Sequence, residues 1–166
     1  MLDIETLRKI RIFEDLQREE LKILLPYLKV QEYQKGEYIL TENSSGDQFY
    51  ILVKGRVKIS RDLVKAFDED MPSTQKVLAT LTGESLPTFG ENGLLGQAPR
   101  NANVIAGSDC LVYSLSKQDF DDFSGANISA AYQIMRKIAQ ILTERLKMTD
   151  DNMVKLATAL YIAVQT

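Results

Sequence analysis

The spacing of apolar residues changes twice along the chain and divides it into three regions. Between residues 4 and 28, apolar positions recur at intervals of three and four, the period of amphipathic helices. Glu19 and Glu20 follow Gln17 closely and supply the acidic first turn with which a helix begins. The leucines expected to form one apolar face are Leu16, Leu21, Leu24, Leu25 and Leu28. The first region is therefore predicted to be helical and to pack on a core.

Residues 30–116 contain short apolar runs separated by turn residues, a pattern typical of strands. The runs are VQEY (30–33), EYILTE (37–42), QFYILV (48–53), KGRVKIS (54–60), KVLATL (76–81) and CLVYSL (110–115). Gly55 predicts a tight turn, because glycine readily adopts a positive φ. The polar, acidic segment 61–75 is expected to be an exposed hairpin connection. Many short strands at regular spacing favour a β-barrel or sandwich over β–α–β units.

Residues 117–166 return to helical spacing. Ser116, with Asp119 three residues later, predicts a capped helix start. From Asn127 onward an apolar seam runs with steps of three and four through Ile128, Ala131, Met135, Ile138, Leu142, Leu146, Thr149, Met153, Leu156, Leu160 and Ala163. The seam predicts one helix of about thirty-five residues, or two joined near residues 149–151.

A helix this long on a small domain protrudes unless its seam is covered. The seam could be covered in two ways. The helix could fold back on the β region, or it could pair with a second copy of the chain as a parallel, coiled-coil-like dimer, and the spacing favours the dimer. The expected division is a β domain with N-terminal helices over residues 1–126 and a lid and dimerisation helix over 127–166.

The amino-acid composition argues against several classes of function. The 166 residues carry a net charge of −3, which argues against a general basic surface for nucleic acid. The chain has no histidine, which removes His-dependent triads and most zinc sites. The single cysteine, Cys110, cannot form a disulfide within the chain, and we expect a reducing, cytoplasmic setting. Neither a membrane-spanning run nor a signal peptide is expected.

The segment FGENGLLGQAPRNANV, residues 89–104, lies between predicted strands and is longer than a turn requires. Gly90 and Gly93 allow close approach of a ligand, and ENGLL predicts a short helix with outward amide groups. Arg100 is suited to grip a phosphate, and Glu91 to accept from a sugar hydroxyl. Such a pair describes a nucleotide site. The alternative, in which Glu91 and Arg100 simply pair across a structured loop, is equally compatible with the spacing.

This segment resembles the phosphate-binding cassette of the cyclic nucleotide-binding domain family. The matching positions are Phe89, Gly90, Glu91, Leu94, Leu95, Pro99, Arg100, Ala102 and Val104. YQKGEYIL (33–40) and GDQFYILVKGRVKI (46–59) are similar to the glycine-punctuated strands of that family. The resemblance extends over about residues 12–157.

The resemblance implies a mainly β fold with flanking helices: a double-stranded β-helix, or jelly-roll-like β-roll, with N-terminal helices and a long C-terminal helix. It implies that Glu91 accepts from the ribose 2′-hydroxyl, that Arg100 holds the cyclic phosphate, and that Thr149 and Asp150 meet the base. The full set of ligand-binding residues implied is Phe89, Gly90, Glu91, Asn92, Gly93, Leu94, Pro99, Arg100, Asn101, Ala102, Thr149 and Asp150.

Three positions depart from the family pattern. Asn101 stands where a small or hydroxyl-bearing residue is usual. Asn92 and Gly93 replace an apolar–Ala pair, which predicts a looser short helix. The connection TGESLPT (82–88) is about two residues longer than is typical of the family. Retention of both Glu91 and Arg100 argues against a wholly degenerate pocket.

The function expected is therefore a non-enzymatic sensor module that binds cAMP or cGMP without a metal. It would act as a homodimer through its C-terminal helix, on an effector protein that the sequence does not identify. The residues after Thr149 lack the turn and basic helix of a helix-turn-helix, so neither nucleic acid nor membrane is an expected partner. The alternative is a degenerate domain that serves dimerisation or protein interaction without a physiological ligand.

Overall fold

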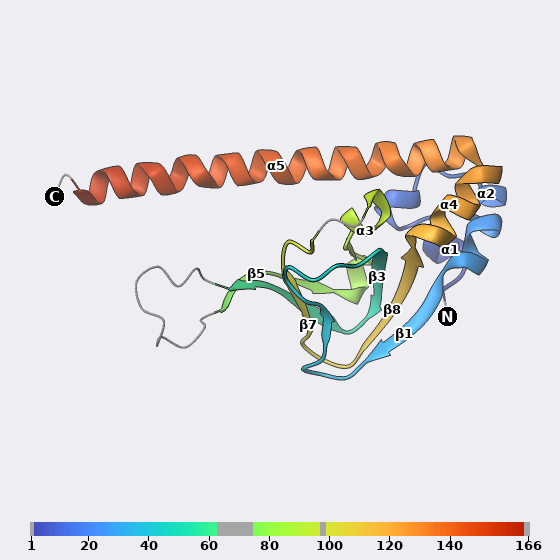
Figure 1. Cartoon of the computed structure of the whole chain (residues 1–166), viewed down its shortest axis with the longest axis horizontal. Helices are drawn as coiled ribbons and strands as arrows, with labels where there is room; N and C mark the ends of the chain where they lie inside the picture. Colours follow the sequence, from blue (N-terminus) through green and yellow to red (C-terminus); the bar gives the residue numbers. More distant parts are fainter. Residues whose placement is uncertain (1, 63–74, 97–98, 165–166) are drawn as a thin grey trace.

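The computed structural model of the chain describes residues 2–62, 75–96 and 99–164. Two four-stranded antiparallel sheets form a β-roll, with short helices at the N-terminus and a long helix at the C-terminus (Figure 1). This is the architecture that the resemblance implied. The predicted hairpin connection at 61–75 lies largely outside the described residues.

The first sheet has the order β1–β8–β3–β6 and the second β2–β7–β4–β5. The bounds are β1 Lys29–Tyr33, β2 Tyr38–Leu40, β3 Gln48–Lys54, β4 Arg56–Asp62, β5 Gln75–Thr82, β6 Thr88–Phe89, β7 Asn103–Ala106 and β8 Cys110–Ser116. The six predicted runs all contain strands, and the turn at Gly55 has a φ of +89°.

Strands β6 and β7 correct the prediction that residues 89–104 form a single loop. Phe89 pairs with Tyr50 on β3, and Ala106 pairs with Val57 on β4. Strands of two and four residues are too short to show a period of two. Only their pairing with distant strands defines them.

The core has two parts, which β3 separates. Phe49 and Ile51 pack toward the helices, whereas Tyr50 and Leu52 pack into the interior of the roll. Successive side chains of a strand point to opposite faces, so a strand buried on both faces is apolar throughout. This explains the unbroken apolar run of β3.

The N-terminal region consists of four short helical turns rather than long helices. They are α1 Ile4–Leu7, η1 Arg11–Phe13, α2 Arg18–Leu24 and η2 Leu25–Tyr27. Gln17 caps α2 in a capping box with Glu20, as the acidic first turn predicted. Of the leucines expected on the apolar face, Leu25 is partly buried and the others are buried.

Helix α4 (Lys117–Ala126) begins at Ser116, whose side chain accepts from the Asp119 amide as predicted. Helix α5 runs without interruption from Ile128 to Val164, which answers the choice between one helix and two. Its first part packs on the body and its second part extends away from the N-terminal helices, past the roll (Figure 1). The expected division at 126–127 falls between α4 and α5.

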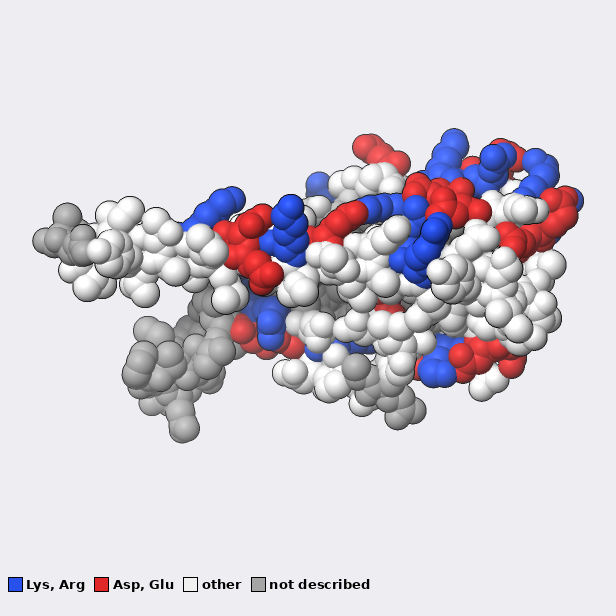
Figure 2. Space-filling model, turned by 90° about the horizontal axis from the view of Figure 1, so that it is seen from above, with Lys and Arg blue, Asp and Glu red and all other residues white. Residues whose placement is uncertain are grey.

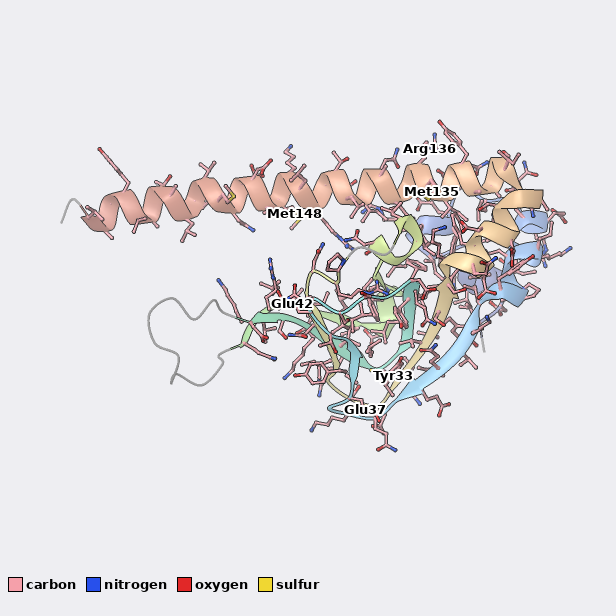
Figure 3. The ribbon with its side chains drawn as sticks, viewed as in Figure 1. Tyr33, Glu37, Glu42, Met135, Arg136 and Met148 are labelled. Atoms are coloured by element: carbon pink, nitrogen blue, oxygen red, sulfur yellow. The ribbon has the colours of Figure 1, made fainter. Side chains whose placement is uncertain are left out.

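Ion pairs join the packed half of α5 to the N-terminal segment. They are Arg11–Glu144 at 2.5 Å, Arg136–Asp15 at 2.9 Å, and Lys137 with both Glu14 at 2.6 Å and Asp15 at 3.2 Å. Seen from above, acids and bases mix over this half, whereas the far end of the helix is mostly uncharged (Figure 2). Arg136 marks the packed half in Figure 3, and Met148 the half toward the C-terminus.

Candidate functional site

A cavity of about 290 Å³ lies between the cassette segment and α5. Its lining comes from the cassette, from α5 and from strands β2, β4 and β7: Leu40, Ile59, Phe89, Gly90, Glu91, Asn92, Arg100, Asn101, Ala102, Val104, Leu142, Arg145, Leu146 and Thr149. A larger hollow near Tyr33 and Cys110 has about 520 Å³. Among the described residues, the only buried charged side chains are Glu91 and Arg100, and both line the smaller cavity.

Arg100 is a buried cation that lines this cavity, and one of its nitrogens is unpaired among the described residues. The residue is 4% exposed. Nη1 donates to the Gly90 carbonyl at 3.1 Å and Nη2 to the Gln48 carbonyl at 2.7 Å. Nε has no hydrogen-bond partner within the described part of the chain. Burial lowers the pKa of the guanidinium, because desolvation disfavours its charge. A bound anion would offset this cost and supply the missing partner.

The loop between β2 and β3 fixes the main chain of Arg100. The Arg100 amide donates to the Ser44 carbonyl at 2.9 Å, and the Asn43 amide donates to the Arg100 carbonyl at 2.8 Å. A Cβ at Gly46 would lie 2.8 Å from Nη2 and 2.9 Å from Nε, so a larger residue there would require the guanidinium to move. The sequence pattern predicted a turn here and did not indicate its contact with the arginine.

Glu91 pairs with an arginine of α5. The carboxylate is buried, and its two oxygens accept from Arg145, at 2.9 Å from Nη2 to Oε1 and 3.1 Å from Nη1 to Oε2. The arginine side chain is half exposed. The alternative of a direct Glu91–Arg100 pair is not what forms: within the described residues, the ion pair of Glu91 is with Arg145.

Arg145 is the site residue that sequence reasoning missed. It is one of several basic residues on a long amphipathic helix, and nothing in its local pattern distinguishes it. The available signal was its spacing: four residues before Thr149, it lies on the same face of α5. Leu142, Leu146 and Thr149 lie on this face too and line the cavity with it.

The cassette turns tightly around its glycines. Gly90 has a φ of +77°, and the Gly93 amide donates to its carbonyl at 2.9 Å. The short helix α3 (Asn92–Leu95) forms as predicted. A Cβ at Gly93 would lie 2.5 Å from the Gln48 carbonyl oxygen, so glycine lets α3 pack directly on β3. The glycine at position 93 therefore allows close packing of the short helix on the sheet.

Eight of the twelve expected site residues line the cavity: Phe89, Gly90, Glu91, Asn92, Arg100, Asn101, Ala102 and Thr149. Of the other four, Gly93 and Leu94 are buried beneath it, and Pro99 and Asp150 are exposed. The Thr149 hydroxyl donates to the Arg145 carbonyl at 2.9 Å, within the helix.

Neither a metal-binding cluster nor a membrane-spanning helix is found among the described residues. No group of three or more acidic or cysteine side chains there could hold a metal ion. No helix in these ranges is both long and apolar enough to cross a bilayer.

A family model and similar curated proteins agree on the family of this chain. The family model described as cyclic nucleotide-binding domain matches residues 30–127. The human cGMP-dependent protein kinase 2 is 33% identical over 122 residues, which are 72% of this chain and 15% of the kinase. The cAMP-dependent protein kinase regulatory subunit of Yarrowia lipolytica is 33% identical over 109 residues, 66% of this chain and 25% of the subunit. The chain thus spans a quarter or less of these relatives.

A similar solved structure is the catabolite activator protein of Thermus thermophilus. It matches with a TM-score of 0.75 over 89% of this chain and 63% of its own, at 23% identity. At this identity the likeness concerns the fold alone.

Proposed function

Because the chain belongs to the cyclic nucleotide-binding domain family, we propose that it is a sensor module whose cavity binds cAMP or cGMP. One observation carries the proposal. Arg100 is buried, its charge is desolvated, and its Nε is unpaired within the described residues while it lines a cavity. A desolvated cation with a free donor favours an anionic group over a neutral one.

The lining supplies the remaining contacts that a nucleotide needs. Arg100 would hold the cyclic phosphate, and Glu91 has lone pairs left to accept from a ribose hydroxyl beside its bonds to Arg145. Leu40, Ile59 and Leu146 give the cavity apolar walls suited to a base. Thr149 is the residue we propose to meet the base. Asp150 would do so only after a change in its exposed position.

Both nucleotides stay candidates, because one similar relative is a cGMP-dependent kinase and another is the regulatory subunit of a cAMP-dependent kinase. No metal is needed for this binding, and the module would bind its nucleotide without chemical change. Cys110 is a free, buried thiol, which suits a reducing compartment such as the cytoplasm.

The proposed signal passes through Arg145. A ligand hydroxyl that engages Glu91 acts on the carboxylate that Arg145 grips, and so acts on α5. A switch of this kind requires the ligand to bind the protein more tightly when α5 is in one position than when it is in another. The effector is a protein that would sense the position of this helix.

We also propose that a second copy covers the distal seam of α5. Leu146, Met153, Leu156 and Leu160 are between 61% and 71% exposed and keep heptad spacing. A row of exposed apolar side chains with this spacing is typical of the seam of a parallel coiled coil.

A second candidate is an interaction domain without a physiological ligand. It is favoured by the engagement of Glu91 with Arg145 and of two Arg100 nitrogens with carbonyl oxygens. Asn101, larger than the usual residue, also lines the cavity beside Arg100.

Titration calorimetry with cAMP, cGMP and inorganic phosphate would separate the two candidates. We expect the wild type to bind a cyclic nucleotide, and Arg100→Ala to lose about 2–5 kcal/mol of binding free energy, because its phosphate partner is desolvated. Arg8→Ala, at a half-exposed arginine away from the cavity, is the matched control and should bind normally.

Absence of binding heat with either nucleotide, together with an unchanged melting temperature, would contradict the sensor. Binding to the folded state alone must raise that temperature. The same result would favour the interaction domain.

A further inference from the structure

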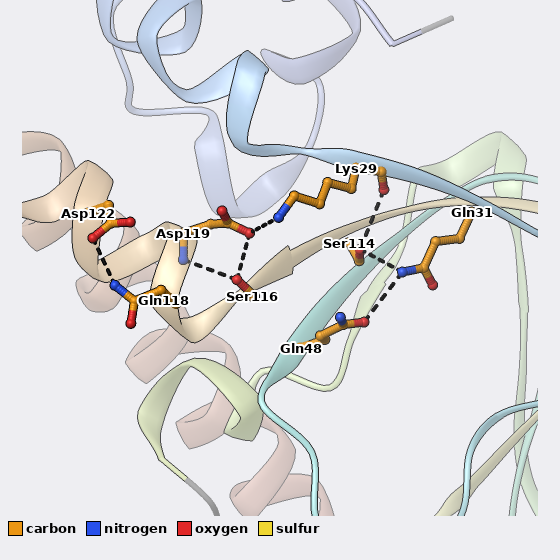
Figure 4. A network of polar contacts seen from close by, with 8 residues as sticks. All are labelled: Lys29, Gln31, Gln48, Ser114, Ser116, Gln118, Asp119 and Asp122. Atoms are coloured by element: carbon orange, nitrogen blue, oxygen red, sulfur yellow. Dashed lines mark hydrogen bonds and ion pairs between the residues drawn. The ribbon is translucent and has the colours of Figure 1, made fainter.

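A chain of side-chain hydrogen bonds crosses the interior of the roll from β1 to β3. The Tyr33 hydroxyl donates to Gln31 Oε1 at 2.7 Å, and Gln31 Nε2 donates to the Ser114 hydroxyl at 3.0 Å. Gln31 Nε2 also approaches Gln48 Oε1 at 3.5 Å, and the Tyr50 hydroxyl donates to that oxygen at 2.8 Å. Figure 4 shows the side-chain amide of Gln31 between Ser114 and the side chain of Gln48, with a dashed line to each.

The main chain of Gln48 supports the candidate site on the other side. Its carbonyl accepts from Arg100 Nη2 at 2.7 Å, the shorter of the two hydrogen bonds of that guanidinium. A Cβ added at Gly93 would lie 2.5 Å from the same carbonyl oxygen, and a Cβ added at Gly90 would lie 3.1 Å from it. One peptide group therefore orients the arginine and seats the cassette turn.

Tyr50 links this residue to the start of the cassette. Its ring stacks on Phe89, with centroids 5.3 Å apart and planes 11° from parallel. Burial raises the pKa of the Tyr50 hydroxyl to about 12, so the group is a neutral donor at physiological pH. Tyr50 can therefore donate its hydrogen bond to Gln48 throughout the physiological pH range.

We propose that Gln48 and Tyr50 are positioning residues for the anion site: Tyr50 holds the Gln48 side chain, and the Gln48 carbonyl then holds Arg100. The proposal rests on the proposed binding of a cyclic nucleotide for its effect on affinity. Neither Gln48 nor Tyr50 lines the cavity itself: the Tyr50 ring stacks on Phe89, and the Gln48 carbonyl accepts from Arg100. Their influence on the ligand is therefore indirect.

A purely structural role predicts something different. A satisfied polar network in a core stabilises the fold wherever it lies. Loss of one of its hydroxyl groups would then lower stability and leave Arg100 unchanged. The two roles are distinguished by measuring the arginine itself.

The test compares Tyr50→Phe with Tyr113→Phe. Tyr113 is also buried and its hydroxyl also makes one bond, with the Leu2 amide at 3.0 Å, away from Gln48. Each variant keeps its ring. We expect Tyr50→Phe to weaken binding of cAMP or cGMP by about three- to tenfold, the effect of one hydrogen bond, and Tyr113→Phe to leave it unchanged.

The same change made in an Arg100→Ala background gives the coupling. There Tyr50→Phe should weaken the residual binding no further, since it acts through Arg100. An equal loss in both backgrounds, or an equal loss in Tyr113→Phe, would overturn the proposal. Gln48→Met, which removes the acceptor while keeping the length of the side chain, should reproduce Tyr50→Phe.

A readout without ligand separates this proposal from the proposed function. The Nε–H signal of Arg100 in a nitrogen-15 NMR spectrum is identified by its loss in Arg100→Lys. In Tyr50→Phe this signal should shift and exchange faster with water, and in Tyr113→Phe it should not. If no nucleotide binds but the signal responds, the sensor fails and the positioning role stands. If nucleotide binds and the signal does not respond, the positioning role fails.

Discussion

The two halves of α5 share one apolar period but have opposite surroundings. In the half up to Ile141, Ile134 and Ile138 are buried to 1% exposure or less, against η1 and the helical side of the core. In the half from Leu146, Leu156 and Leu160 are 71% and 64% exposed. The cavity lies where one half gives way to the other, at Leu142, Arg145, Leu146 and Thr149.

This contrast shows that an apolar period identifies a helix face that needs a packing partner but does not identify the partner. The body is long enough to cover only the first half of the helix. The first half is thereby anchored, while the second is left for another partner. A ligand at the transition contacts α5 at the point where it stops being held, which suits the transmission of a signal.

The largest effect expected is on the anchored half. Ile138→Ala should lower the free energy of unfolding by about 2–5 kcal/mol, because it leaves a cavity in a packed core. Leu156→Ala, measured by urea unfolding of dilute protein, should change it by about 0.5 kcal/mol or less, as an exposed position does. An equal loss in the two variants would remove the distinction between the halves.

A second prediction sharpens the comparison by asking what covers the distal half. Replacing Leu156 and Leu160 together with Glu should weaken self-association by about tenfold or more, since charge at a seam is unfavourable. Thr158→Glu, exposed on another face of the same segment, is the control and should associate normally. Sedimentation over a range of concentrations measures both. A wild type that stays monomeric at all concentrations would leave the seam to a different partner.

The smallest effect concerns the ion pairs that hold the anchored half. Lys137 and Arg136 lower the pKa of the Asp15 carboxyl below its ordinary 3.8, and Arg11 lowers that of Glu144 below its ordinary 4.5. Lowered values in the folded state stabilise the protein above those ordinary values, and this stability is lost as the pH falls through the folded values. Both carboxylates lie at the surface, so screening by salt keeps the contribution small.

The measurement is the melting temperature of the wild type and of the double variant Asp15→Asn, Glu144→Gln. The wild type should melt higher at about pH 6, and the difference should shrink as the pH falls below about 4 and the carboxylates take up protons. A difference that stays constant with pH would show that these ion pairs do not contribute through charge.

Much of the candidate site could be predicted because its signals are local. The cassette motif places Glu91, Arg100 and their glycines within sixteen residues of one another. Helix caps at Gln17 and Ser116 and the turn at Gly55 depend on neighbouring residues and were confirmed. The helical region at the N-terminus was predicted too, although not its division into short turns.

Other features escaped prediction because they depend on contacts between distant residues. Strands β6 and β7 exist only through pairing with β3 and β4. The partner of Glu91 is Arg145, fifty-four positions away, and one of the two acceptors for Arg100 is the carbonyl of Gln48, fifty-two positions away. A main-chain carbonyl carries no sequence signal at all.

The strands with strong periods, the cassette with its Glu91 and Arg100, and the apolar period of the C-terminal helical region could be read from the sequence, since each follows from spacing or backbone chemistry within one segment. Only the tertiary structure decided that Glu91 faces α5, that Gln48 holds Arg100, and that half of the seam is covered. These three contacts depend on which surfaces the folded chain brings together. Apolar spacing indicates that a surface needs a packing partner, but it does not identify the partner.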